Sequence, residues 1–248
     1  MATLLVKEMK SLLPFGKITN VPFLTEEECL TTYTAIYELK KMWSRRHENK
    51  YTLGAASYID ANSNIYPHVS YYGKAKLLNP ILKENFGWLY QRLGDILAEE
   101  LKKNICYQKK LALPGFHIFL SGPKTIDREK SLHVDFQGKL LKWDYSESID
   151  FHEPISFTMA IKLPECGGGL DILDMRYEEY ITLSPEEQKQ IFNSDLVKTY
   201  PYKLGYLLIR SGNIFHEVAA MPHIQLGEER ITLQGHGLLC QDTWYLYW

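Results

Sequence analysis

Two stretches decide the fold: Ser131–Gln137, SLHVDFQ, and Gly212–Ile231, GNIFHEVAAMPHIQLGEERI. The first holds His133 and Asp135 in a His-x-Asp pair, and the second holds His216 and then Arg230, 230 − 216 = 14 positions later. Residues two apart on a strand point to the same face, so we expect His133 and Asp135 to share one face. Two imidazoles and one carboxylate on one side of a metal leave its other side open, which suits Fe(II) with a chelating co-substrate and O2.

A His-x-acid pair is weak support by itself, because 8 His and 30 acidic residues in 248 give roughly one such pair by chance. The surrounding segments add the weight, because strand-like runs flank each candidate residue in a fixed order. These segments are LHVDF at Leu132–Phe136, ISFTMAIKLPECGGGLDIL at Ile155–Leu173, GYLLIRSGNIFHEV at Gly205–Val218 and ERITLQGHG at Glu229–Gly237.

In this order the segments resemble those of the Fe(II)/2-oxoglutarate-dependent dioxygenases, over roughly Leu111–Cys240. The resemblance implies a mainly β chain with accessory helices, whose core is a double-stranded β-helix (a jelly-roll, cupin-like fold) braced by N-terminal helices. It also implies Fe(II) on His133, Asp135 and His216, with O2 as oxidant. Arg230, assisted by Thr232, would bind the distal carboxylate of 2-oxoglutarate. Hydroxylation of a small molecule, such as an amino acid or a natural-product intermediate, is the first expected reaction, with desaturation or cyclisation as related outcomes.

We expect one oxygenase domain over 1–248, made of a helical scaffold and lid loop (1–107), a jelly-roll core (108–240) and a last outer strand (241–248). Thr25 and Glu28 form a capping box that starts a helix running to about Trp43. A second helix is predicted from about Phe86 to Lys103–Asn104, and the segment before it, 51–80, is predicted to be a Tyr-rich loop. Residues 175–200 are predicted to be an insertion with a short helix.

Several polar and aromatic side chains are candidates for substrate contacts because they fall in the lid loop, at the rim or on inward strand faces. They are Tyr58, Tyr71, Tyr72, His117, Gln137, Trp143 and Gln234. Ordinary packing is the alternative for each tyrosine, and a buried, hydrogen-bonded core histidine is the favoured alternative for His117. Arg45, Arg46 and Arg210 are further candidates for holding a substrate carboxylate, although Arg45 and Arg46 fit a solvated helix end better.

The amino-acid composition limits the kinds of binding partner that this chain is expected to have. A net charge of −2 without a basic patch argues against nucleic acid and an anionic membrane surface. Lys7 and Lys10 interrupt the apolar N-terminal run, which therefore predicts neither a signal peptide nor a membrane span. Four scattered cysteines without a C-x-x-C motif suggest reduced thiols in the cytoplasm. The predicted partner is a small molecule, and the sequence does not decide the oligomeric state.

Three other functions fit part of the pattern. A cupin-like metalloenzyme that uses no 2-oxoglutarate would not need Arg230, and a non-catalytic jelly-roll binding module would not need all four polar residues. A zinc hydrolase would accept the same ligand types. For Arg230 itself, the structural alternative is a surface salt bridge with Glu228 or Glu229.

Overall fold

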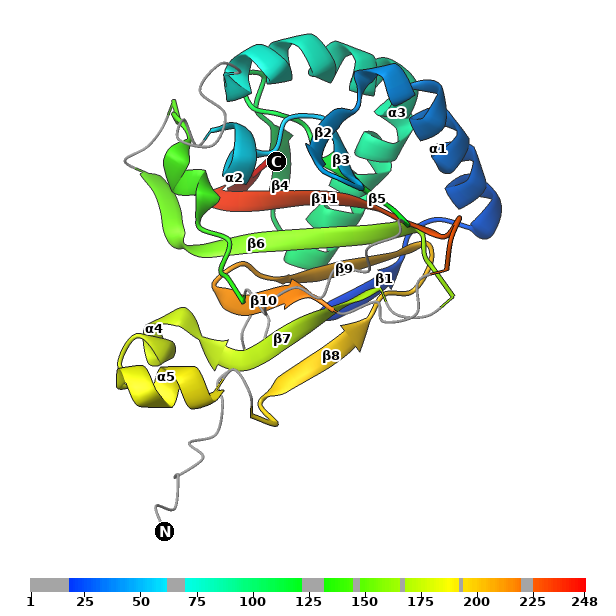
Figure 1. Ribbon diagram of the computed structural model, residues 1–248. Coiled ribbons are helices and arrows are strands. Elements are labelled where there is room, and N and C mark those ends of the chain that lie inside the picture. The colour runs from blue at the N-terminus through cyan, green and yellow to red at the C-terminus, as the bar shows by residue number, and fades with distance from the viewer. Residues whose placement is uncertain are drawn as a thin grey trace.

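The structure, a computed structural model, describes residues 18–61, 70–121, 132–144, 148–165, 168–191, 194–219 and 225–248. It is mainly β with accessory helices, as the sequence predicted, and its strands form two sheets. In Figure 1 the smaller sheet lies on one side of the larger one, and the helices α1 (Glu26–Glu38) and α3 (Tyr71–Leu101) lie on the other.

The larger sheet has the strand order β1-β9-β6-β11-β5-β3-β2, with β12 paired to β11 and β4 paired to β12. Every pairing in it is antiparallel except that of β12 with β4. Its strands are β1 (Thr19–Pro22), β2 (Ser44–His47), β3 (Lys50–Leu53), β4 (Asn104–Tyr107), β5 (Gly115–Leu120), β6 (Ile149–Lys162), β9 (Tyr206–Ser211), β11 (Glu229–Cys240) and β12 (Thr243–Tyr247).

The smaller sheet is β10-β7-β8, with β7 spanning Gly169–Arg176, β8 Val197–Pro201 and β10 Ile214–Val218. An isolated bridge between His133 and His216 adds residue 133 beside β10. From β5 onward the chain passes between the two sheets: β5 large, His133 small, β6 large, β7 and β8 small, β9 large, β10 small, β11 large. This alternation is the double-stranded β-helix that the sequence predicted.

Alternation along the strands of the large sheet decides which side chains face the small sheet. Ile231 and Leu233 of β11 and Ile155 and Phe157 of β6 pack in the core under α1 and α3. The residues between them therefore point the other way, into the space between the sheets. Apolar members of that inner layer are Ala160, Leu170, Ile172, Tyr202, Leu208 and Ile214. Its polar members are His117, Ser156, Thr158, Arg210, Arg230, Thr232 and His236.

The first predicted helix is confirmed. Thr25 accepts a hydrogen bond from the Glu28 amide while the Glu28 carboxylate accepts one from the Thr25 amide, so the capping box forms. The α-helix ends at Glu38 and continues as the 3-10 helix η1, Lys40–Met42.

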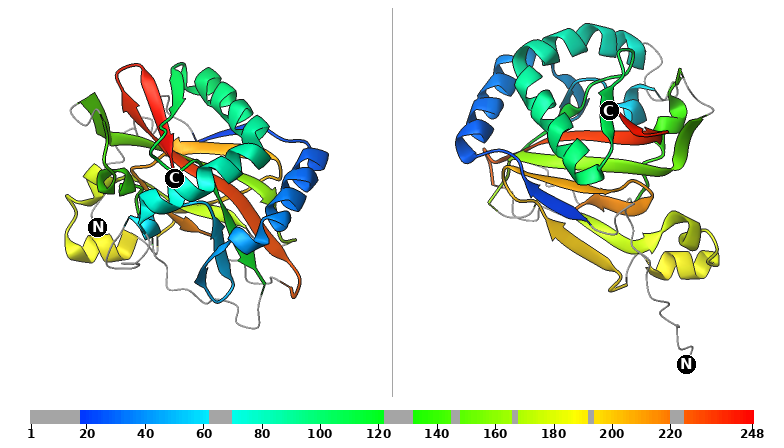
Figure 2. Two further views of the ribbon diagram at one scale, coloured as in Figure 1. Left: turned by 90° about the horizontal axis from the view of Figure 1, so that it is seen from above. Right: turned by 180° about the vertical axis from the view of Figure 1, so that it is seen from behind.

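The second helix is longer than predicted: α3 begins at Tyr71 and spans 31 residues, with Pro80 inside it and a kink at Phe86, where φ is −127° and ψ is 19°. The predicted helix corresponds to the part from the kink onward. Figure 2 shows α3 along the back of the large sheet. Most of the predicted loop 51–80 is therefore structured, as β3, the short helix α2 (Ser57–Asp60) and the first turns of α3. The loop prediction, which rested on the Gly, Ser, Asn and Tyr residues of this segment, was wrong for these parts, while 62–69 lie outside the described residues. A proline usually ends a helix, yet Pro80 stands inside this one. Here buried side chains on both sides of it, Ala75, Leu78 and Leu82, hold the helix against the core.

The predicted insertion 175–200 is shorter in the structure. In the described part of this segment the helices α4 (Tyr177–Tyr180) and α5 (Pro185–Ile191) lie outside the sheets, and residues from Val197 onward form β8, which pairs with β7. The tail 243–247 forms the predicted strand, β12. Across the described ranges, no helix is both long and apolar enough to cross a membrane.

Candidate metal centre

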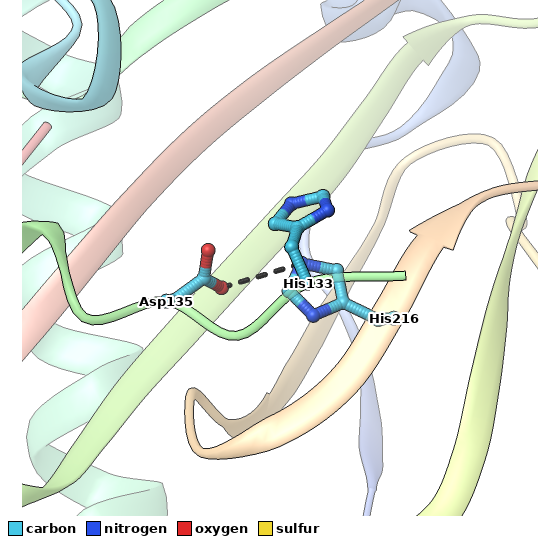
Figure 3. A group of neighbouring side chains, drawn as sticks. All are labelled: His133, Asp135 and His216. Atoms are coloured by element: carbon cyan, nitrogen blue, oxygen red, sulfur yellow. Dashed lines mark ion pairs between the residues drawn. The ribbon is translucent and has the colours of Figure 1, made fainter. Parts of the chain in front are cut away.

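His133, Asp135 and His216 come together although they lie up to 83 positions apart (216 − 133). One ligand atom from each residue lies within 4.8 Å of the others. Figure 3 shows the three side chains gathered in one place. Main-chain hydrogen bonds hold the two segments together. The amides of His133 and His216 each donate to the other's carbonyl, at 3.0 and 2.9 Å, and the Asp135 amide donates to the Gly212 carbonyl at 2.7 Å. The triad predicted as ligands is therefore one cluster.

The segment that carries the first two members is not the regular strand that the sequence suggested. Within 132–137, the described part of this segment, His133 alone bridges to β10, and the chain then turns into the 3-10 helix η2, Gln137–Leu140. Phe136 already has φ −99° and ψ 11°, outside the β region, so no ladder continues past it. His133 is exposed while Asp135 and His216 are buried, which leaves the cluster open on the His133 side.

Asp135 is held as a carboxylate by its neighbours. Its Oδ2 accepts hydrogen bonds from Ser156 Oγ at 2.7 Å and from Arg210 Nη2 at 2.6 Å. Burial alone would raise the pKa of this carboxyl group, but the positive charge of the Arg210 guanidinium beside it holds that pKa well below its usual value. A charged carboxylate is the form that ligates a metal.

His216 is fixed with a lone pair directed at the same space. Its Nδ1 lies 3.0 Å from the Ile214 carbonyl, to which it donates, and its Nε2 lies 2.7 Å from Arg210 Nη2. Because a guanidinium only donates, Nε2 is the acceptor and the ring proton is on Nδ1. Burial, with the Arg210 charge, lowers the pKa of His216 well below its usual value, so the imidazole is neutral, as a metal ligand must be.

The donor set fits a divalent metal with open positions. Two imidazoles and one carboxylate are the ligands of non-haem Fe(II) oxygenases, and the same ligand types also suit zinc. One feature opposes the ion: Arg210 Nη2 contacts both Asp135 Oδ2 and His216 Nε2. A cation bound to His216 Nε2 therefore replaces that hydrogen bond, while the bond to Asp135 can persist. Arg210 was a candidate for holding a substrate carboxylate, but the structure shows its guanidinium bound to Asp135 and His216 instead.

Arg230 is a fully buried cation without a counter-ion in the described part of the chain. Its Nε, Nη1 and Nη2 have no hydrogen-bond partner there, and its guanidinium carbon lies 4.8 Å from the centroid of the Phe119 ring and 5.4 Å from that of the Tyr202 ring. The hydroxyls of Thr232 and Tyr202 are buried and unpartnered as well. Burial lowers the pKa of Arg230, against the effect of Tyr202 and Tyr58.

An unpaired buried guanidinium is costly, and a carboxylate that accepts two of its N–H groups would satisfy it. The surface salt bridge considered for Arg230 is wrong. Glu228 accepts from the amides of Glu165 and Gln225, and Glu229 accepts from the Tyr37 hydroxyl. The residues present therefore fit the distal carboxylate of a dicarboxylic acid such as 2-oxoglutarate.

No protein-family model matches the chain, and no curated protein matches it in sequence. Its structure, however, is similar to that of an N-substituted L-amino acid dioxygenase from Burkholderia ambifaria AMMD, crystallised with α-ketoglutarate. That match has a TM-score of 0.52 at 12% identity and covers 92% of this chain and 84% of the other. A second structure of the same dioxygenase matches with a TM-score of 0.50 over the same shares, also at 12% identity. The two proteins share a fold.

Within this double-stranded β-helix, the candidate substrate residues divide into two groups. His117, Gln137 and Gln234 come from inward-facing or adjacent positions: His117 Nε2 lies 2.5 Å from the Tyr58 hydroxyl, and Gln137 Nε2 lies 2.7 Å from His236 Nε2. Burial, then the charges of Lys50 and Arg230, hold the pKa of His117 well below its usual value, so Tyr58 donates to a neutral ring. The centroid of the His117 ring lies 5.9 Å from that of Tyr58 and 5.1 Å from that of Trp248.

Tyr71, Tyr72 and Trp143 use their polar atoms on the main chain. The two hydroxyls accept from the amides of Ala112 (3.0 Å) and Lys142 (2.6 Å), and the Trp143 indole donates to the Gly138 carbonyl at 2.8 Å. All three belong to one apolar cluster with Tyr247. Their substrate role stays a prediction, and these contacts show a packing role.

The structure also corrects the view of Arg46 as part of a solvated helix end. Its side chain is 4% exposed and pairs with both oxygens of the buried Asp60, at 2.8 and 2.6 Å. Arg45, beside it, is exposed.

Sequence reasoning missed three polar residues around Asp135. Ser156 and His236 were not named as candidates, and Arg210 was considered only for substrate. The period-two pattern of β6 and β11 does place Ser156 and His236 on the inward faces. Only the pairing of His236 with Ser156, and of Ser156 with Arg210, brings them to the triad.

Proposed function

We propose that this chain is a non-haem Fe(II) oxygenase that couples oxidative decarboxylation of 2-oxoglutarate to C–H oxidation of a small molecule. The observation that carries the proposal is the presence of both an open 2-His-1-carboxylate cluster and a buried guanidinium that has no anionic partner in the described part of the chain. The first matches the ligand set for Fe(II), and the second matches a dicarboxylate that chelates the metal at one end.

His133, Asp135 and His216 would hold Fe(II), and Arg230 with Thr232 would bind the distal carboxylate of 2-oxoglutarate. When bound, the iron and 2-oxoglutarate supply the activation of O2, with release of succinate and CO2. The side chains of the protein would position the metal and 2-oxoglutarate and would exclude water from the site. Asp135 and His216 are buried in fixed protonation states, and the fully buried Arg230 guanidinium contacts the rings of Phe119 and Tyr202. Aromatic neighbours strengthen the guanidinium–carboxylate attraction because they lower the local dielectric constant.

Hydroxylation is the outcome we propose first. The structural neighbour is an N-substituted L-amino acid dioxygenase, so N-substituted and free amino acids are the first substrates to test. His117, Gln137, Gln234 and Tyr58 are the substrate contacts we favour. The 2-oxoglutarate-independent metalloenzyme is disfavoured because it gives Arg230 no anion. A small-molecule partner and a cytoplasmic location stay predictions of the sequence.

The test is succinate release by the purified full chain with Fe(II), O2 and 2-oxoglutarate, screened over a panel of amino acids and natural-product precursors. His133→Ala and Asp135→Ala should abolish release because each removes one of three ligands. His152→Ala is the matched control, an exposed histidine outside the cluster, and should leave release unchanged. Arg230→Ala should raise the 2-oxoglutarate concentration needed for half-maximal rate. Turnover unaffected by the His133 and Asp135 variants would exclude the proposed centre.

A further inference from the structure

Asp135 and three side chains near it, Ser156, His236 and Gln137, form a closed ring of hydrogen bonds. Ser156 Oγ lies 2.7 Å from Asp135 Oδ2 and 2.9 Å from His236 Nδ1. His236 Nε2 lies 2.7 Å from Gln137 Nε2, which also reaches Asp135 Oδ1 at 3.4 Å. All four residues are at most 9% exposed. Both oxygens of the carboxylate are therefore held by the same ring, one from each end.

The negative charge of Asp135 decides which atoms in the ring donate a hydrogen bond and which accept one. The Asp135 carboxylate has no proton, so Ser156 must donate its only hydroxyl proton to it. His236 Nδ1 must then donate to Ser156, which leaves Nε2 as an acceptor. The Gln137 amide has two protons and can donate one to His236 and the other to Asp135 Oδ1. Each member has its partners, so the network avoids the cost of an unsatisfied buried group.

The sheet makes this ring rigid. His236 and Ser156 are direct partners across β11 and β6, and Ser156 is the direct partner of Arg210 across β6 and β9. The three residues thus form one row on the inner face of the large sheet. Arg210 adds its own bond to Asp135 Oδ2. Only Asp135 and Gln137 come from the irregular segment after His133, so the sheet supplies the fixed side of the ring.

We infer that Ser156, His236 and Gln137 are positioning residues that fix the orientation of Asp135 for metal binding. This inference rests on the proposed metal site, since it gives these residues their task. A carboxylate on an irregular segment has no regular backbone ladder to restrict it. The ring supplies that restriction before the ion arrives, and residues that orient a metal ligand in this way typically change metal affinity 10–100-fold when removed.

The test measures binding of Co(II) alone, by calorimetry and by the visible absorption of the bound ion, on the full chain without 2-oxoglutarate. Ser156→Ala and His236→Leu should each weaken affinity about 10–100-fold. The double variant should be little weaker than the worse single variant, because either change opens the same ring. His236→Asn keeps a donor near the Nδ1 position and should restore most of the affinity. Thr158→Val, which alters the next inward hydroxyl on β6, is the matched control and should bind like the wild type.

A purely structural role for the ring predicts lower thermal stability with unchanged Co(II) affinity and an unchanged spectrum, which would overturn the inference. Additive losses in the double variant would overturn it too, because the residues would then act separately. Gln137 lies in η2 and not in a strand, so Gln137→Met breaks the ring without changing either sheet. If the strand variants do not fold, the Co(II) affinity of this variant tests the inference. Failure of the proposed function looks different: the wild type would bind no Co(II), or His133→Ala would bind it equally well.

Discussion

Arg230 should destabilise the free chain, because its charge is buried without a partner, and should stabilise the proposed complex with 2-oxoglutarate. Without an anion it is a buried cation whose three nitrogens have no hydrogen-bond partner among the described residues. We therefore expect Arg230→Met to stabilise the chain in the absence of 2-oxoglutarate, by about 1 kcal/mol or more, which is about 2–4 °C in Tm for a chain of this size. The same change should abolish the stabilisation that 2-oxoglutarate gives the metal-loaded wild type, about 2.7 kcal/mol at 100 times Kd. Thermal unfolding with and without 2-oxoglutarate measures both effects.

Arg46→Met is the control for this prediction because it makes the same change at a buried arginine that has a partner. It leaves Asp60 with only Lys74 and a backbone amide, so it should destabilise the chain, by about 3–5 kcal/mol. If Arg230→Met instead destabilised the chain as Arg46→Met does, Arg230 would have a partner in solution and the proposed anion site would lose its basis.

Single residues could be predicted from the sequence where their role depends on the order and spacing of neighbouring segments in the chain. His133, Asp135, His216 and Arg230 could be named because each occurs next to a strand-like run in a recognisable sequence of segments. Ser156 and His236 could not be joined to them, since the contact depends on the register between β6 and β11. One sequence indicates which face a strand residue occupies but not which residue lies opposite it.

Among the elements, α1 carries a prediction about pH. Glu28 closes the capping box at its start and also pairs with Arg92 of α3, at 2.8 Å, so one carboxylate joins the two helices that cover the sheet. The Arg92 hydrogen bond, with the Thr25 amide, lowers the pKa of Glu28 from 4.5 to about 2. A lowered pKa means that the folded state favours the charged form. The contribution is therefore complete above pH 4.5 and is lost as pH falls towards 2.

We accordingly expect Glu28→Gln to be less stable than the wild type at neutral pH, by about 1 kcal/mol or less because the pair is partly exposed to solvent. The difference should shrink between pH 4.5 and 2 and vanish below that range. Denaturant unfolding of both proteins across this range measures it. A difference that stays constant down to pH 2 would mean that the carboxylate charge contributes nothing.

Local signals explain which elements the sequence could predict. The capping box lies within four consecutive residues, so α1 was found at its true start. Strand β8 and the first turns of α3 were missed because tertiary contacts decide them: β8 is defined by its pairing with β7, and α3 passes through Pro80 on a buried face. The His133–Asp135 segment shows the reverse, since an alternating pattern there forms only one bridge.

For the whole molecule, residues far apart in the chain meet around Trp248. Its indole lies over Gly54 and Gly115, its amide donates to the Ala112 carbonyl, and its carbonyl accepts from the Ser57 amide. A Cβ on Gly115 would lie 2.0 Å from the Trp248 ring. This contact links β3, β5 and the residue that follows β12, and it places an indole beside His117 in the barrel interior. No short window of sequence contains this arrangement.

We expect Gly115→Ala to displace the indole and destabilise the chain by about 1–3 kcal/mol, the usual cost of overpacking. Because the ring also borders His117, the same variant should alter substrate affinity more than 2-oxoglutarate affinity. Trp248→Phe removes part of the clashing ring, so the double variant should recover stability relative to Gly115→Ala alone. Gly87→Ala is the control, since nothing lies within 4 Å of a Cβ at that helical position. Unfolding free energies of the four variants decide the matter: a Gly115→Ala chain as stable as the Gly87→Ala chain would show that Trp248 does not occupy this position in solution.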